Sequence, residues 1–181
     1  MKFHEQKIKG VWLIEPEPYE DERGIFSRRF CQQEFRERDI ETRICQTNLS
    51  QNYKKYTLRG FHYQIPPHEE SKTLYCVSGE IYNVVVDLRP ESESFLEWTA
   101  VRLSRENKSG LHVPAGCANA YLTLADDTTI HYYMSEYYKP NSYRGFRYND
   151  PMFSVKWISD PAVISQKDLG YADFDPDSLK R

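Results

Sequence analysis

The chain has 181 residues, of which 39% are hydrophobic and 28% are charged, a composition typical of a globular rather than a disordered protein. Its formal net charge of −3 argues against a general nucleic-acid or membrane-surface binder, because the phosphates of those partners attract basic surfaces. No run approaches the roughly 18 apolar residues of a membrane span and the N-terminus lacks an apolar signal core, so we expect a cytoplasmic protein in which residues 1–181 form one domain.

Strand-like runs dominate the predicted elements. In the first part of the chain we predict strands over 11–16, 24–30 and 44–52, with one polar helix over 31–40. Further strands follow in quick succession over 57–64, 73–79, 80–89, 97–104, 110–116, 118–125 and 129–138. Turn residues such as SGE, RPESES and RENKSG separate them, and a short helix near 165–169 is expected to pack across them.

This pattern predicts an all-β fold, an antiparallel sandwich or barrel with a few short helices, mainly near the C-terminus. Within 80–89, the alternation places Tyr82, Val84, Val86 and Leu88 on one face of a strand. The residues before Thr57 lack tight hairpin signals, which suggests the hypothesis that this arm exchanges strands with a partner chain.

A Pro-x-Gly turn at Pro114 and Gly116 resembles the turn between two strands of cupin-type jelly rolls. Cupins that bind a metal normally carry a histidine at the place of Asn119 and an HxH motif where this chain has His62-Tyr63-Gln64. Only His68, Glu69 and Glu70 remain as compensating ligands, and they lie in a polar loop that is expected to be solvated. We therefore predict no metal and no cofactor.

The segment LRGFHYQIPPHEESK places an arginine, a histidine and a lysine, Arg59, His62 and Lys72, near one another along two predicted strands. Together they suit an anionic ligand that must lose and regain a proton, because fixed cations bind phosphate and imidazole serves as a base. From spacing alone, the favoured interpretation of His62 is a hydrogen-bonded core histidine. Tyr132 lies beside Tyr133, so a register change of one residue would exchange their faces.

Several motifs occur together: DERGIFSRRF, TLRGFHYQ, VVVDLR, HVPAGCANAYL, YYMSEYYKP and RGFRYNDP. In this order and spacing, from about Asp21 to Asp168, they resemble the dTDP-4-dehydrorhamnose 3,5-epimerase family. The resemblance implies a cupin-like jelly-roll barrel, usually a homodimer, that works without a metal. It also implies an isomerase that inverts C3, C5 or both in a nucleotide-diphospho-4-keto-6-deoxy sugar, as a step of deoxysugar and polysaccharide biosynthesis.

The same resemblance implies roles for four catalytic residues. His62 matches the general base, and Asp168 matches the carboxylate that orients its imidazole. Tyr132 matches the tyrosine that returns the proton from the opposite face, and Lys72 matches the lysine near the developing enolate oxygen. These residue types suit the reaction, because a proton beside a ketone is only weakly acidic and the enolate oxygen needs a nearby positive charge.

The implied substrate-binding residues are Arg23, Phe26, Gln46, Asn48, Arg59, Asn119, Tyr138 and Lys167. Among them, Arg23 and Arg59 match arginines that hold the diphosphate, and Tyr138 or its neighbour Tyr137 matches an aromatic ring that stacks near the base.

Two positions depart from the family pattern. Asn119 replaces a histidine, and it cannot carry a proton or a charge, while Arg28 replaces a glutamate used near the nucleotide base. These departures leave open which carbon is inverted and whether the nucleotide is dTDP, GDP or CDP. The alternative functions are a 3,4-ketoisomerase-type sugar cupin, a non-catalytic nucleotide-sugar-binding paralogue and a metal-dependent dioxygenase.

Overall fold

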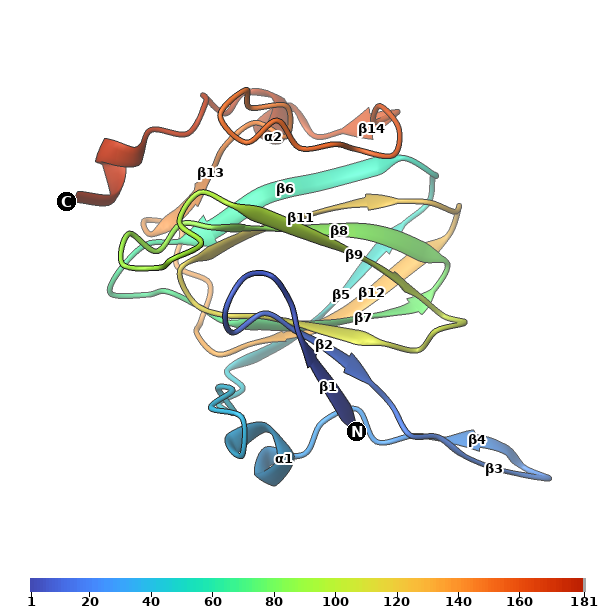
Figure 1. The fold of residues 1–181 in the computed structure, drawn as a ribbon. Helices are drawn as coiled ribbons and strands as arrows, with labels where there is room; N and C mark the ends of the chain where they lie inside the picture. The colour runs from blue at the N-terminus through green and yellow to red at the C-terminus, as the bar shows by residue number, and fades with distance from the viewer. Residues whose placement is uncertain (181) are drawn as a thin grey trace.

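The computed structural model describes residues 1–180, which form mainly β-strands (Figure 1). The strands are β1 (Lys2–Glu5), β2 (Trp12–Glu15), β3 (Tyr19–Asp21), β4 (Gly24–Phe26), β5 (Gln46–Asn52), β6 (Thr57–Gln64), β7 (Lys72–Ser78), β8 (Glu80–Asp87), β9 (Trp98–Ser104), β10 (Gly110–Val113), β11 (Cys117–Thr123), β12 (Thr128–Met134), β13 (Tyr143–Gly145) and β14 (Val163–Ile164). The helices are α1 (Gln32–Arg36), α2 (Gln166–Leu169) and the 3-10 helix η1 (Pro176–Lys180). Within the described residues, no helix is long and apolar enough to cross a membrane.

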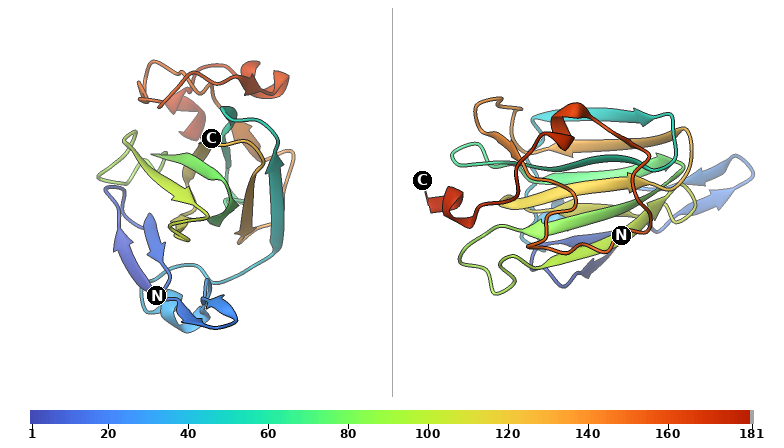
Figure 2. Two further views of the ribbon diagram at one scale, coloured as in Figure 1. Left: turned by 90° about the vertical axis from the view of Figure 1, so that its right-hand side faces the viewer. Right: turned by 90° about the horizontal axis from the view of Figure 1, so that it is seen from above.

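Two sheets face each other across the interior (Figures 1 and 2). One has the strand order β1-β2-β10-β7-β12-β5, and the other has the order β13-β6-β11-β8-β9, with β14 added parallel to β6. The strands β3 and β4 form a separate hairpin that projects from the body (Figure 1). This architecture confirms the predicted all-β jelly-roll barrel with only a few short helices.

The strand β8 is buried on both faces, which explains its nearly continuous apolar sequence. Ile81 and Val85 face the core between the sheets, where they pack with residues such as Leu74, Leu103 and Ile130. The alternate residues, which include the predicted face of Tyr82 to Leu88, belong to a second core outside the sheet. The predicted alternation is therefore confirmed.

The second core lies beneath the C-terminal part of the chain, which runs over the outer face of β6 (Figures 1 and 2). Phe61 and Phe146 stack there with ring centroids 4.7 Å apart, and Phe153 and Phe174 complete the apolar contact. Because Phe61 precedes His62, this packing supports the strand that carries the predicted base.

Several predicted bounds differ from the structure. The strand predicted over 24–30 ends at Phe26, and the helix predicted over 31–40 is limited to α1. Phe35 is the only buried residue of α1, so little packing is available to extend the helix. The strands β1, β3, β13 and β14 were not predicted, because edge strands of two to four residues depend on the neighbouring strand rather than on their own alternation.

Candidate active site

A cavity of about 430 Å³ opens between the two sheets, and its walls contain most of the predicted site. The predicted residues that line it are His62, Lys72, Tyr132, Gln46, Asn48, Arg59, Asn119 and Tyr138. Tyr137, the alternative to Tyr138, does not line it and is 56% exposed. The fold thus brings together side chains from five strands, together with Tyr138 after β12.

His62, in the wall of this cavity, is hydrogen-bonded to Asp168, which does not itself line the cavity. The Nε2 atom of His62 lies 2.8 Å from Oδ1 of Asp168, which is 5% exposed. An ionised carboxylate only accepts, so Nε2 donates and the lone pair of Nδ1 remains to take a proton. Burial lowers the pKa of His62, and the hydrogen bond with Asp168 opposes this shift by favouring the charged ring.

Asp168 is itself held in place by hydrogen bonds with Gly60 of β6 and with Ser165, the residue before α2. The amide of Gly60 donates to its Oδ2 at 3.3 Å, and the hydroxyl of Ser165 caps α2 by accepting from the amide of Asp168 at 3.0 Å. Burial alone would raise the pKa of this carboxyl, but the interaction with His62 and the hydrogen bond from the Gly60 amide outweigh burial, so the net pKa lies below its usual value. The predicted orienting role of Asp168 has a matching geometry.

Gly60 lets β11 approach β6 closely beside the base. Its φ is +117°, and a Cβ at this position would lie 2.6 Å from the carbonyl oxygen of Asn119 and from the Cβ of Ala120. The pairing of β6 with β11 changes register here, and Asn119 lies opposite His62. The glycine of the RGFH motif is therefore required by the backbone geometry that places these two side chains together.

Tyr132 enters the cavity from the sheet that faces His62. It lies on β12, while His62 lies on β6, and the two strands belong to different sheets. Tyr133, the neighbour of Tyr132, points to the other face of β12 and packs on Phe30. The pKa of Tyr132 is raised by burial, with Arg59 opposing and Glu70 adding to the shift, so its phenol stays protonated at neutral pH.

Lys72 begins β7 and reaches the cavity with its ammonium group. Its Nζ lies 2.7 Å from Oε1 of Glu70. The expectation that Glu70 lies in a solvated loop is wrong, because this residue is 5% exposed. Among residues 1–180, no group of three or more His, Cys, Asp or Glu side chains is arranged to hold a metal ion.

Asn119 presents a defined amide orientation to the cavity. Its Nδ2 donates to the carbonyl oxygen of Val84 at 3.1 Å and to Oδ1 of Asn83 at 3.0 Å. A backbone carbonyl cannot donate, so the amide cannot be reversed without losing the bond to Val84. The amino group is thereby occupied, and Oδ1 remains to accept a hydrogen bond from a ligand.

Two predicted residues lie far from this cavity. Arg23 and Phe26 belong to the projecting β3–β4 hairpin, where Arg23 pairs with Asp21 and Phe26 is 75% exposed (Figure 1). Within one chain they do not contribute to the site, because the hairpin extends away from the barrel. Arg28, the other departure from the family pattern, pairs with Glu34 at 3.0 Å outside the cavity.

Lys167 lies in an adjoining cavity of about 340 Å³, which shares Arg59, His62 and Tyr143 with the first. Its Nζ lies 4.4 Å from the ring centroid of Tyr143. The predicted binding role of Lys167 therefore requires a ligand that reaches past Arg59 into this second space.

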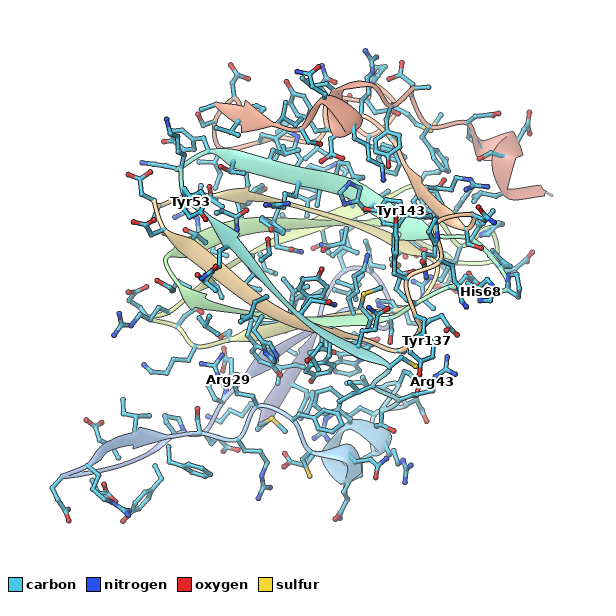
Figure 3. All side chains as sticks on the ribbon, turned by 180° about the vertical axis from the view of Figure 1, so that it is seen from behind. Arg29, Arg43, Tyr53, His68, Tyr137 and Tyr143 are labelled. Atoms are coloured by element: carbon cyan, nitrogen blue, oxygen red, sulfur yellow. The ribbon has the colours of Figure 1, made fainter. Side chains whose placement is uncertain are left out.

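Tyr143 is a site residue that the sequence did not predict. It lines both cavities, and its ring centroid lies 5.2 Å from that of His62. Figure 3 places Tyr143 at the end of the barrel where His68 and Tyr137 also lie, opposite the end marked by Tyr53. Nothing distinguishes Tyr143 among the 14 tyrosines of the chain except the pairing of β13 with β6.

Residues 5–175 match the family model described as dTDP-4-dehydrorhamnose 3,5-epimerase. The chain belongs to this family. A curated family member from Methanothermobacter thermautotrophicus, named dTDP-4-dehydrorhamnose 3,5-epimerase, is 37% identical over 94% of this chain and 92% of its own length. These similarities do not favour the ketoisomerase, binding-protein or dioxygenase alternatives.

Solved structures of the family superpose closely on this chain. The dTDP-4-dehydrorhamnose 3,5-epimerase of Elizabethkingia anophelis has a TM-score of 0.92 at 32% identity, over 96% of each chain. A double mutant of ChmJ, a 3′-monoepimerase from Streptomyces bikiniensis in complex with dTDP, has a TM-score of 0.88 at 28% identity, over 98% of this chain and 89% of that one. Its replaced histidine and tyrosine are as far apart along the chain as His62 and Tyr132.

Proposed function

We propose that this protein epimerises a dTDP-linked 4-keto-6-deoxy sugar by moving a proton between the two faces of the sugar ring. The observation that carries this proposal is the placement of a base and a neutral acid on facing sheets of one cavity, with His62 on β6 and Tyr132 on β12. Inversion needs a base on one face of the sugar ring and an acid on the other, because the proton leaves one face and returns to the opposite one.

In the first step, Nδ1 of His62 takes the proton from the carbon beside the C4 ketone. The electron pair of the broken C–H bond forms a double bond to C4, and the carbonyl oxygen on C4 becomes an enolate oxygen. Asp168 stabilises the imidazolium through its bond to Nε2, and the ammonium of Lys72 stabilises the negative oxygen.

In the second step, the phenol of Tyr132 donates its proton to the same carbon from the opposite face, and the enolate returns to a ketone. Solvent then reprotonates the phenolate and takes the proton from the imidazolium, so the enzyme is restored. Both C3 and C5 flank the ketone, and we expect the same pair of groups to serve them in turn.

The nucleotide end of the substrate is proposed to lie toward Arg59 and Lys167. Arg59 lines both cavities, and its Nε donates to Asn52 at 2.8 Å, which orients the guanidinium at their junction. A planar guanidinium binds diphosphate oxygens in pairs, and an ammonium adds a second positive charge. Because a charged sugar nucleotide does not cross a membrane unaided, we propose that the enzyme works in the cytoplasm, as one domain, in deoxysugar and polysaccharide biosynthesis.

The decisive test is solvent exchange in D₂O. The protein is incubated with dTDP-, GDP- and CDP-linked 4-keto-6-deoxy sugars, and the C3 and C5 protons are followed by NMR. We expect deuterium at both carbons with the dTDP sugar and slower uptake with the other two. Failure of all three sugars to exchange at either carbon contradicts the proposed function.

We also propose a homodimer in which the β3–β4 hairpin completes the site of the partner. The hairpin exposes Tyr19, Ile25 and Phe26, with exposed fractions of 64%, 50% and 75%, on a segment that extends away from its own barrel (Figure 1). An apolar surface of this kind on a projecting arm suits burial against another chain. The same dimer arrangement would bring Arg23 of one chain to the diphosphate of the substrate bound by the partner.

Mixed dimers test this arrangement. Arg23→Ala and His62→Asn variants are purified, unfolded together, refolded as an equal mixture and assayed. If the hairpin serves the partner, a hybrid dimer contains one intact site, so the mixture recovers about a quarter of the unmodified activity. A hairpin that serves its own chain gives hybrids with no intact site, and the mixture then shows no gain over the separate variants.

A further inference from the structure

Glu70 is a buried carboxylate that the reaction described above does not use. It is 5% exposed, and one of its oxygens, Oε1, lies 2.7 Å from the ammonium of Lys72. The other oxygen, Oε2, is buried and has no hydrogen-bond partner among the described residues. A carboxylate that is removed from water and only half satisfied is unfavourable for folding, so its presence calls for a reason other than stability.

The position of Lys72 supplies that reason. Its side chain is only 14% exposed, and it lines the cavity that contains His62 and Tyr132. A lysine has a long, flexible side chain whose ammonium would otherwise sample many positions. Glu70 lies two residues before Lys72, at the edge of β7, and its carboxylate holds the ammonium from the side of the protein. The remaining N–H groups of Lys72 are left to point toward a ligand.

We propose that Glu70 is a positioning residue, which holds the ammonium of Lys72 at the place where the enolate oxygen of the substrate develops. This inference rests on the proposed function, because it assigns Glu70 to the same reaction. It adds a residue from a loop whose sequence predicts only a solvated acid. Glu70 does not line the cavity, so it acts through Lys72 rather than on the sugar.

The negative charge of Glu70 also affects the pKa of Tyr132. Burial is the main reason that the pKa of Tyr132 is raised, and the negative charge of Glu70 raises it further against the opposing effect of Arg59. The carboxylate thus helps to keep the phenol of Tyr132 in the protonated form that a donor requires. Because burial already keeps the phenol protonated at neutral pH, the main contribution of Glu70 is to position Lys72.

A double-mutant cycle tests the proposal. The full-length variants Glu70→Gln, Lys72→Met and the double variant are compared with the unmodified protein for kcat and KM of deuterium exchange on the dTDP sugar. We expect Glu70→Gln to lower kcat by about tenfold to a hundredfold with little change in KM, because a misplaced ammonium stabilises the enolate less well. In the Lys72→Met background, Glu70→Gln should change kcat less than twofold.

Thermal unfolding of the same four proteins gives a readout that does not need activity. Glu70→Gln should lower the Tm when Lys72 is present and raise it when Lys72 is replaced by methionine, because the carboxylate is then buried without a cation. Glu69→Gln is the matched control, since Glu69 is the exposed neighbour, and it should leave kcat and KM unchanged.

Two results would overturn the role of Glu70. One is a kcat of Glu70→Gln equal to that of the unmodified protein, and the other is an equal loss of kcat from Glu70→Gln with and without Lys72. An unmodified protein that exchanges no proton contradicts the proposed function itself, and the four Tm values then still report whether the two side chains are coupled.

Discussion

Replacing His62 with asparagine is expected to abolish exchange of the C3 and C5 protons with solvent, with a loss of about 10²–10⁴-fold or more in rate. Asparagine retains polarity and approximate size, but its amide cannot take a proton from carbon. His62 lines the cavity, and its bond from Nε2 to Asp168 leaves Nδ1 to take the proton. Exchange is measured by NMR in D₂O at equal protein concentrations.

The matched control is His131→Asn. His131 lies on β12 next to Tyr132 and outside the cavity lining, so its replacement should leave the exchange rate within about twofold. Persistent exchange in His62→Asn at the rate of the unmodified protein would show that another group is the base.

The pH dependence of the rate follows from the same pair. Burial lowers the pKa of His62 below its usual value of 6.5, although Asp168 opposes that shift. The ring acts as a base only when it is neutral, so the rate should rise with pH through this lowered pKa and be level at neutral pH. Asp168→Asn removes the opposing interaction, so it should move this rise to lower pH while it lowers the plateau.

Replacing Tyr132 with phenylalanine is expected to separate exchange from inversion. His62 still removes the proton and returns deuterium to the same face, so wash-out continues. Inversion should fall by about 10²-fold or more, because the facing sheet no longer supplies a proton. The measurement compares loss of the C3 and C5 proton signals with appearance of the epimer in one NMR time course.

Tyr133→Phe is the control for this variant, because Tyr133 is the next residue on the same strand and faces away from the cavity. It should invert the substrate at nearly the unmodified rate. Full-speed inversion by Tyr132→Phe would instead move the acid to another phenol, and Tyr143, which lies beside His62, would be the next to replace.

Much of the fold follows from patterns within single strands. The alternation along β8 and the turns between the strands after Thr57 predicted a two-layer β architecture, because side chains of a strand point to opposite faces at every step. The same alternation separates Tyr132 from Tyr133, although only the observed pairing of β12 with β7 and β5 decides which of the two faces inward.

The features that the sequence did not predict depend on contacts between segments that are far apart in the chain. Tyr143 reaches His62 because β13 pairs with β6, and Glu70 is buried because its loop folds back against the site. Arg23 carries a matching motif, yet the hairpin that holds it leaves the barrel of its own chain (Figure 1). No local pattern predicts such encounters, because they depend on which distant strands become neighbours.

The sequence by itself therefore determined the strand-rich class of this protein and the family to which it belongs, and it predicted His62, Asp168, Tyr132 and Lys72 as the chemical groups of the site. Only the tertiary structure decided that the imidazole and the phenol stand on facing sheets, and that Lys72 has a buried carboxylate beside it. The physical reason is the sequence separation over which each effect acts. Periodicity and turn chemistry act between residues a few positions apart, whereas burial, charge pairing and opposition across a cavity arise only when strands far apart in the chain pack together.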